Sequence, residues 1–76
     1  MGRYYKISKM ITEDEAKQIL AELLEVENVE NAAFDESCSG ITVWTKDGEF
    51  SAVMDRAVNI FSRDGRGSEL SFVRFV

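Results

Sequence analysis

The sequence contains no histidine, no proline and a single cysteine among its 76 residues. The missing histidine removes the commonest metal ligand and the usual proton shuttle near neutral pH. Because Cys38 is the only thiol, no disulfide can form within the chain, and a lone thiol is typical of a reducing cytoplasm. No apolar run approaches the ~20 residues that cross a bilayer, and the first ten residues lack the apolar core of a signal peptide. We therefore expect a soluble, cytoplasmic protein without direct membrane insertion.

Positive charge is also scarce, since nine Lys and Arg residues face fourteen Asp and Glu residues and leave a formal net charge of −5. This negative field repels phosphate backbones, so we expect neither nucleic acid nor an anionic membrane as a partner. Nucleophile-and-base pairs usually need a histidine, and we therefore expect no enzyme. The short length and the 45% hydrophobic content predict one globular domain over residues 1–76.

What the chain does contain is a succession of strand and helix patterns. Residues 3–9, 29–35, 41–45 and 69–76 have strand composition or spacing. Apolar residues from Ala16 to Leu24 recur every three or four positions, which predicts a helix from Thr12 to near Glu27. A second helix is predicted to start with Ser51 as its cap and to stop at Gly65, and Asn28 to be left-handed. The order β-α-β-β-α-β predicts an α+β, ferredoxin-like sandwich, in which two helices cover one face of a four-stranded antiparallel sheet.

The stretch "MITEDEA", residues 10–16, lies where the first strand gives way to the first helix. Thr12 and Glu15 form the T-x-x-E pattern of a capping box, in which each side chain accepts a bond from the other residue's amide. Glu13 and Asp14 add negative charge where the helix dipole favours it. An alternative is that Glu13, Asp14 and Glu15 bind a hard ion such as Mg²⁺, Ca²⁺ or Mn²⁺, although at most two of the three can share one ion.

The same stretch resembles the metal-binding motif of heavy-metal-associated (HMA) domains, the modules of copper chaperones and of the N-terminal regions of metal-pumping P-type ATPases. That family carries Met-x-Cys-x-x-Cys between its first strand and first helix. Met10 falls on the methionine, Thr12 and Glu15 fall on the two cysteines, and Ala16 falls on a small residue that often follows. The resemblance extends along the chain through "LLEVENVENAAFD", "GITVWTKDG" and "VMDRAVNIF".

The resemblance implies a degenerate HMA domain, because a hydroxyl and a carboxylate are poor substitutes for the thiolates that soft ions need. We expect that Cys38 cannot take their place, because we expect its turn at the opposite end of the sheet from the first loop. The implied function is a regulatory or interaction module of metal transport without thiolate metal binding and without a cofactor. Its partners would be a protein or other domains of a transporter, on the cytoplasmic side.

Strand alternation places Tyr5, Ile7, Ile41 and Val43 toward the helices and a second set of residues on the open face. This open-face set comprises Tyr4, Lys6, Thr42 and Trp44, with Phe72 and Arg74 on a flanking strand. Tyr4 and Trp44 are expected to stand together near the middle of this face. Such aromatics can simply cover the sheet, anchor a protein contact or stack on RNA bases, but charge and the missing RNP1-like run disfavour RNA.

The alternative function is thus a ferredoxin-like protein–protein interaction module unrelated to metals, which uses the open face and forms at most a weak homo-oligomer. The face taken by Phe72 stays undecided, because "LSFVRFV" alternates acceptably in either register. The loop "RDGRGS", residues 63–68, has glycines and arginines that could hold a phosphate. It lacks the P-loop ending and precedes a strand, so we interpret it as a turn.

Overall fold

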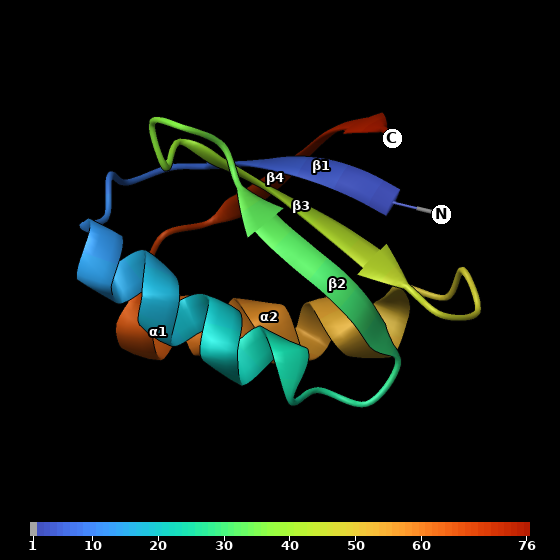
Figure 1. Ribbon diagram of the computed structural model, residues 1–76. Coiled ribbons are helices and arrows are strands. Elements are labelled where there is room, and N and C mark those ends of the chain that lie inside the picture. Colours follow the sequence, from blue (N-terminus) through green and yellow to red (C-terminus); the bar gives the residue numbers. More distant parts are fainter. Residues whose placement is uncertain (1) are drawn as a thin grey trace.

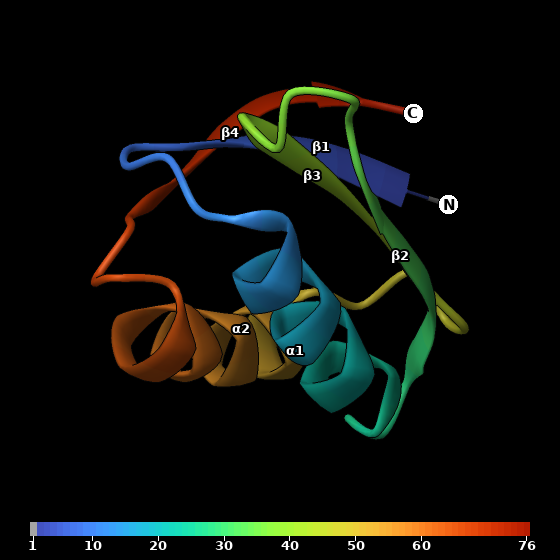
Figure 2. The ribbon, with the colours of Figure 1, turned by 60° about the vertical axis from the view of Figure 1, so that its left-hand side comes forward.

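The computed structural model describes residues 2–76, so that Met1 of the predicted 1–76 domain lies outside the described residues. Figure 1 shows four strands and two helices in the order β-α-β-β-α-β. Their bounds are β1 Gly2–Ile7, α1 Glu13–Leu24, β2 Val29–Phe34, β3 Gly40–Thr45, α2 Ser51–Asp64 and β4 Leu70–Phe75. The strands form one antiparallel sheet in the order β2-β3-β1-β4, and Figure 2 confirms that both helices lie on the same face. The predicted fold class is confirmed.

The core lies between this sheet and the helices. Fully enclosed side chains come from both layers: Ile19, Leu23, Ile41, Val43, Val53 and Phe61. Tyr5 and Ile7 of β1 are buried as well, which confirms the face predicted for them. Each such side chain contributes about 1.5–3 kcal/mol when it is removed from water, so the core is the main source of stability. Neither helix within residues 2–76 is long and apolar enough to cross a membrane.

The first helix ends three residues earlier than predicted. Glu25 is its C-cap and donates its amide to the Glu22 carbonyl, and the Val26 amide donates to the Leu23 carbonyl. The chain then turns so that Val26 is buried. Asn28 is left-handed with φ 77°, as predicted, and its side-chain amide donates to the carboxylate of Asp47 at 2.5 Å. This bond joins the loop after α1 to the loop after β3.

The second helix begins differently from the prediction. Phe50 is the N-cap, its ring is buried, and Ser51 is the first helical residue. The prediction that Ser51 caps the helix is therefore wrong, because burial of the Phe50 ring sets where the helix starts. The helix runs to Asp64, and the amide of Gly65 bonds the carbonyl of Phe61 at 2.8 Å, so Gly65 does end it.

The loop between β1 and α1 and the turn between β2 and β3 lie at the same end of the sheet. Lys6 of β1 pairs with Gly40 of β3, and the Ile7 amide donates to the carbonyl of Ser39 at 3.1 Å. The expectation that Cys38 lies at the opposite end is therefore wrong. The reason is topological: α1 runs back along the sheet, so β2 ends where β1 ended (Figure 1).

Candidate functional site

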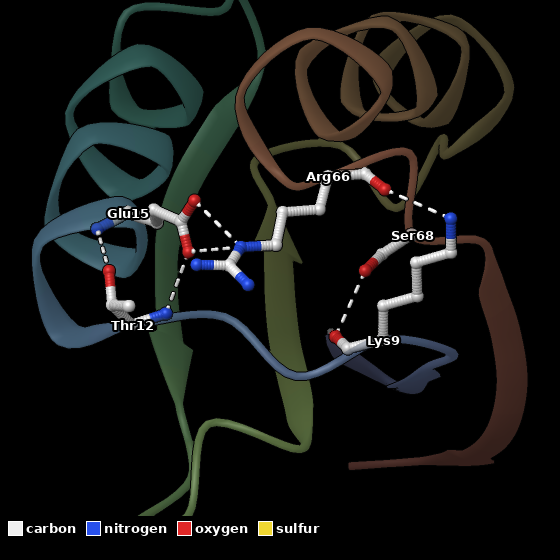
Figure 3. Close-up of polar contacts among 5 residues, drawn as sticks. All are labelled: Lys9, Thr12, Glu15, Arg66 and Ser68. Atoms are coloured by element: carbon white, nitrogen blue, oxygen red, sulfur yellow. Dashed lines mark hydrogen bonds and ion pairs between the residues drawn. The ribbon is translucent and has the colours of Figure 1, made fainter.

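The start of α1 is a capping box, as the T-x-x-E pattern predicts. The Glu15 amide donates to Oγ1 of Thr12 at 3.1 Å, and the Thr12 amide donates to Oε1 of Glu15 at 2.8 Å (Figure 3). These two bonds satisfy donors that would otherwise have no partner at a helix start. Glu13 and Asp14 lie exposed in the same first turn. Both positions that align with the family's cysteines thus belong to the helix cap.

An arginine from the far end of the sequence completes this junction. Nε of Arg66 lies 3.0 Å from both carboxylate oxygens of Glu15, and Figure 3 shows its side chain reaching across to α1. The Thr12 amide, followed by the Arg66 guanidinium, holds the pKa of Glu15 below its usual value. Arg66 itself is left-handed, with φ 59°. The sequence pattern did not identify this residue, because 51 positions separate it from Glu15.

Further bonds connect the first loop to the loop between α2 and β4. Nζ of Lys9 donates to the Arg66 carbonyl at 3.2 Å, and Oγ of Ser68 donates to the Lys9 carbonyl at 3.0 Å (Figure 3). Next to them, the Glu69 amide donates to Oγ of Ser8 at 2.8 Å. Residues 65–69 therefore hold the first loop in place through the side chains of Arg66 and Ser68. Arg63 and Asp64 of the predicted loop belong instead to the last turn of α2.

The junction offers few atoms to a metal ion. Met10 is 76% exposed. The two positions that the resemblance assigns to cysteines are Thr12 and Glu15, whose side chains offer only oxygen atoms. Within residues 2–76 no group of three or more Cys, Asp or Glu side chains is arranged to hold a metal. Cys38 does lie near α1: it lines a cavity of about 370 Å³ together with Glu13 and Ala16. A single thiol is still a poor site for a soft ion, and oxygen ligation by Glu13 and Asp14 stays a prediction.

On the open face, the Tyr4 ring packs over Gly40 and the Trp44 ring packs over Gly2. A Cβ at Gly40 would lie 2.7 Å from Cε1 of Tyr4, and one at Gly2 would lie 2.6 Å from Nε1 of Trp44. Gly40 is paired with Lys6, whereas Gly2 is paired with Trp44 itself. The two rings therefore lie toward opposite ends of β1, and the expectation that they stand together is wrong.

The Tyr4 hydroxyl forms a hydrogen bond to the turn between β2 and β3. It donates to Oδ2 of Asp35 at 2.8 Å, and this bond, followed by burial, raises the pKa of Tyr4. Burial alone would raise the pKa of Asp35, but bonds from the Tyr4 hydroxyl and the Ser39 amide outweigh it and lower that pKa. The Arg74 guanidinium lies 4.5 Å from the centre of the Tyr4 ring. These contacts give the open-face aromatics a structural role, with Lys6 exposed beside them.

Phe72 lies on the helix side of the sheet, so its placement beside Arg74 on the open face is wrong. Tyr4 pairs with Arg74, but Tyr5 pairs with Phe72, because the register shifts between the two tyrosines. The bulge reverses the alternation of β4. The ring of Phe72 lies 5.8 Å from that of Tyr5 and 5.0 Å from that of Phe75.

The sheet order and the two helices on one face define a ferredoxin-like sandwich. The solved structure of the yeast copper transporter domain Ccc2a, determined in apo and Cu(I)-loaded states, has a similar fold with a TM-score of 0.70. The match covers 99% of this chain and 97% of that one at 13% sequence identity, and at this identity it shows the fold alone. No family model and no curated protein matches the sequence.

Proposed function

We propose that this chain is a degenerate HMA domain that works as a regulatory or interaction module of metal transport and binds no soft metal through thiolates. The observation that carries the proposal is the capping box of Thr12 and Glu15, closed by Arg66. The shared fold with a copper transporter domain supports the link to metal transport. Its partner would be a protein or other domains of a metal transporter. The chain itself would be cytoplasmic or the cytoplasmic domain of a membrane transporter.

The chemistry of the junction supports this reading. A cation that approached Glu15 would have to displace a guanidinium held 3.0 Å from both oxygens. It would also disturb the helix cap, whose loss costs about 0.5–2 kcal/mol. Soft ions would gain only oxygen ligands in return, which they bind poorly. We also propose that the chain has no catalytic role, because it has no histidine to serve as a general base near neutral pH.

Titration with Cu(I) and with Mn(II) tests the proposal, with a chromophoric chelator as competitor and the amide signals of residues 12–15 as readout. We expect no stoichiometric binding at the junction. The double substitution Thr12→Cys and Glu15→Cys, made in a Cys38→Ser background, should bind one Cu(I), and Thr12→Cys alone is the matched control. Capture of one equivalent of Cu(I) by the unaltered chain, with shifts at these amides, would contradict the proposal, whereas capture of Mn(II) would assign Glu13 and Asp14 as oxygen ligands.

A second candidate is an interaction module that uses the open face and has no link to metals. Trp44, Tyr4 and Arg74 retain exposed surface on this face, and Trp, Tyr and Arg are typical interface anchors. Sedimentation should then show a mass that rises with concentration, and Trp44→Ala should abolish the rise. Leu24→Ala, at a residue 51% exposed on α1, is the control. An unchanged mass profile in Trp44→Ala would exclude this face as a self-association surface.

A further inference from the structure

Exposed apolar side chains gather along β4, at the edge of the sheet. Its side chains are more than two-fifths exposed, and they comprise Phe72, Val73, Phe75 and Val76, with Val58 of α2 beside them. Within residues 2–76 no strand pairs with the outer side of β4. Contiguous apolar patches of this kind mark interaction sites, and free strand edges accept further strands.

A groove opens beside this edge, between the sheet and the start of α2. It has a volume of about 350 Å³, and we call it the β4–α2 groove. Its walls combine apolar side chains, among them Tyr5, Phe50, Met54 and Phe72, with the polar side chains of Arg3, Glu49 and Ser51. Phe75 extends this wall, because its ring packs edge-on against Phe72. The groove is large enough for one or two apolar side chains.

One cation lies in this groove without an acidic partner. The Arg3 guanidinium lies 4.4 Å from the centre of the Phe50 ring, and 5.6 Å and 5.4 Å from those of Phe72 and Phe75. None of the ion pairs found among residues 2–76 includes Arg3, and its Nε is buried without a hydrogen-bond partner there. Glu49 also lines the groove but forms no ion pair with Arg3, and the first turn of α2 holds no acidic residue. A buried charged donor of this kind favours an incoming carboxylate.

We propose that the β4–α2 groove and the edge of β4 bind an extended, acidic and apolar peptide segment of another protein. The segment adds to β4 as a further strand, places an apolar side chain in the groove and pairs a carboxylate with Arg3. Backbone bonding supplies the affinity of such strand addition, and the groove supplies its specificity. The proposal goes beyond the metal-free junction and does not depend on it.

Charge decides between this occupant and a second copy of the chain. A second copy would bring to this edge a β4 strand whose one charged side chain is Arg74, and like charge opposes its approach to Arg3 and Arg74. An acidic strand instead meets these two cations with the opposite charge. The opposite edge of the sheet is less suited to it, because β2 carries Glu30 and α1 packs beside it. Charge complementarity therefore selects the β4 edge for an acidic partner.

The test uses two synthetic peptides of six residues, the length of β4. One contains Val, Phe and Glu, and the other carries Lys in place of each Glu. We expect saturable binding of the Glu peptide by fluorescence anisotropy, with shifts of the β4 amides and of the Arg3 Nε–H signal. Arg3→Gln should weaken this binding about tenfold or more. Arg56→Gln, at an exposed arginine of α2 outside the groove, should leave it unchanged.

Arg3→Gln could destabilise the fold, because Arg3 packs against three aromatic rings, so a second variant is needed. Phe75→Ser changes a side chain that is 64% exposed and should weaken the Glu peptide while the fold persists. Equal affinity for the Lys peptide, shifts confined to α1 or the open face, or no saturation by about 1 mM would overturn the proposal. A dimer in sedimentation that Phe75→Ser dissolves would assign the groove to a second copy and would overturn it as well.

Discussion

Thr12 uses its hydroxyl oxygen to close the first turn of α1, at a position where the resembling family has a metal ligand. Thr12→Ala should lower the free energy of unfolding by about 1 kcal/mol, because it removes the bond to the Glu15 amide. Urea denaturation measures the change. Ser51→Ala is the matched control, since Ser51 makes no capping bond at α2, and its effect should stay within about 0.5 kcal/mol. An equal loss of unfolding free energy in Thr12→Ala and Ser51→Ala would show that the Thr12 side chain does not stabilise the helix start.

Glu15 makes stability depend on pH. Its pKa in the folded chain is below that of an unfolded glutamate, about 4.3, so its bonds contribute stability above that value. This contribution disappears as the pH falls through the folded pKa. Glu15→Gln should therefore be less stable than the unaltered chain at neutral pH, and urea unfolding should show the gap closing toward about pH 2. Glu30→Gln, on an exposed residue of β2, should show no comparable gap, and a gap that widens in acid would contradict the assignment.

Local spacing was sufficient to predict the capping box, because both of its bonds join residues three positions apart. It was insufficient to predict Arg66, whose contact with Glu15 depends on where the chain returns after α2. The topology contained the missing signal. In the predicted β-α-β-β-α-β order, the loop after α2 returns to the end of the sheet where α1 begins, and it contains Arg66.

Between β1 and β3, the pairing of large and small residues shapes the open face. Gly40→Ala should force the Tyr4 ring off the strand and break its bond to Asp35, because the added Cβ would overlap the ring. We expect a loss of about 1–2 kcal/mol in urea unfolding. In a Tyr4→Ala background the same substitution should cost much less, so the double-mutant cycle should show positive coupling. Additive effects would mean that the ring and the glycine are independent.

The order of elements and the buried faces of β1 and β3 followed from periodicity. The face of Phe72 did not, because one unpaired residue in β4 reverses the alternation and no short-range signal marks it. The start of α2 was misjudged for a related reason. Serine is the better cap by propensity, but burial of the Phe50 ring outweighs that preference.

The whole molecule has two unlike regions at its surface. At one end of the sheet, the first loop is bound to the loop after α2 through Ser8, Lys9 and Glu15. Along the side, β4 presents apolar residues and Arg74, with Arg3 of β1 beside it, in a chain whose net charge is −5. The first region holds its polar groups within the chain, and the second offers unpaired ones. We therefore place the capacity for partners at the edge of the sheet and not at the junction that resembles a metal site.

This asymmetry predicts how the chain behaves near its isoelectric point. A net charge of −5 at pH 7 keeps copies apart, and this repulsion vanishes near pH 4.6. Light scattering should then rise, because the exposed apolar edge of β4 is no longer protected by charge. Phe75→Ser should reduce the rise, whereas Leu24→Ser, at a residue 51% exposed on α1, should reduce it far less. Circular dichroism at the same pH confirms that the chain is folded, and equal effects of both substitutions would show that association does not involve β4.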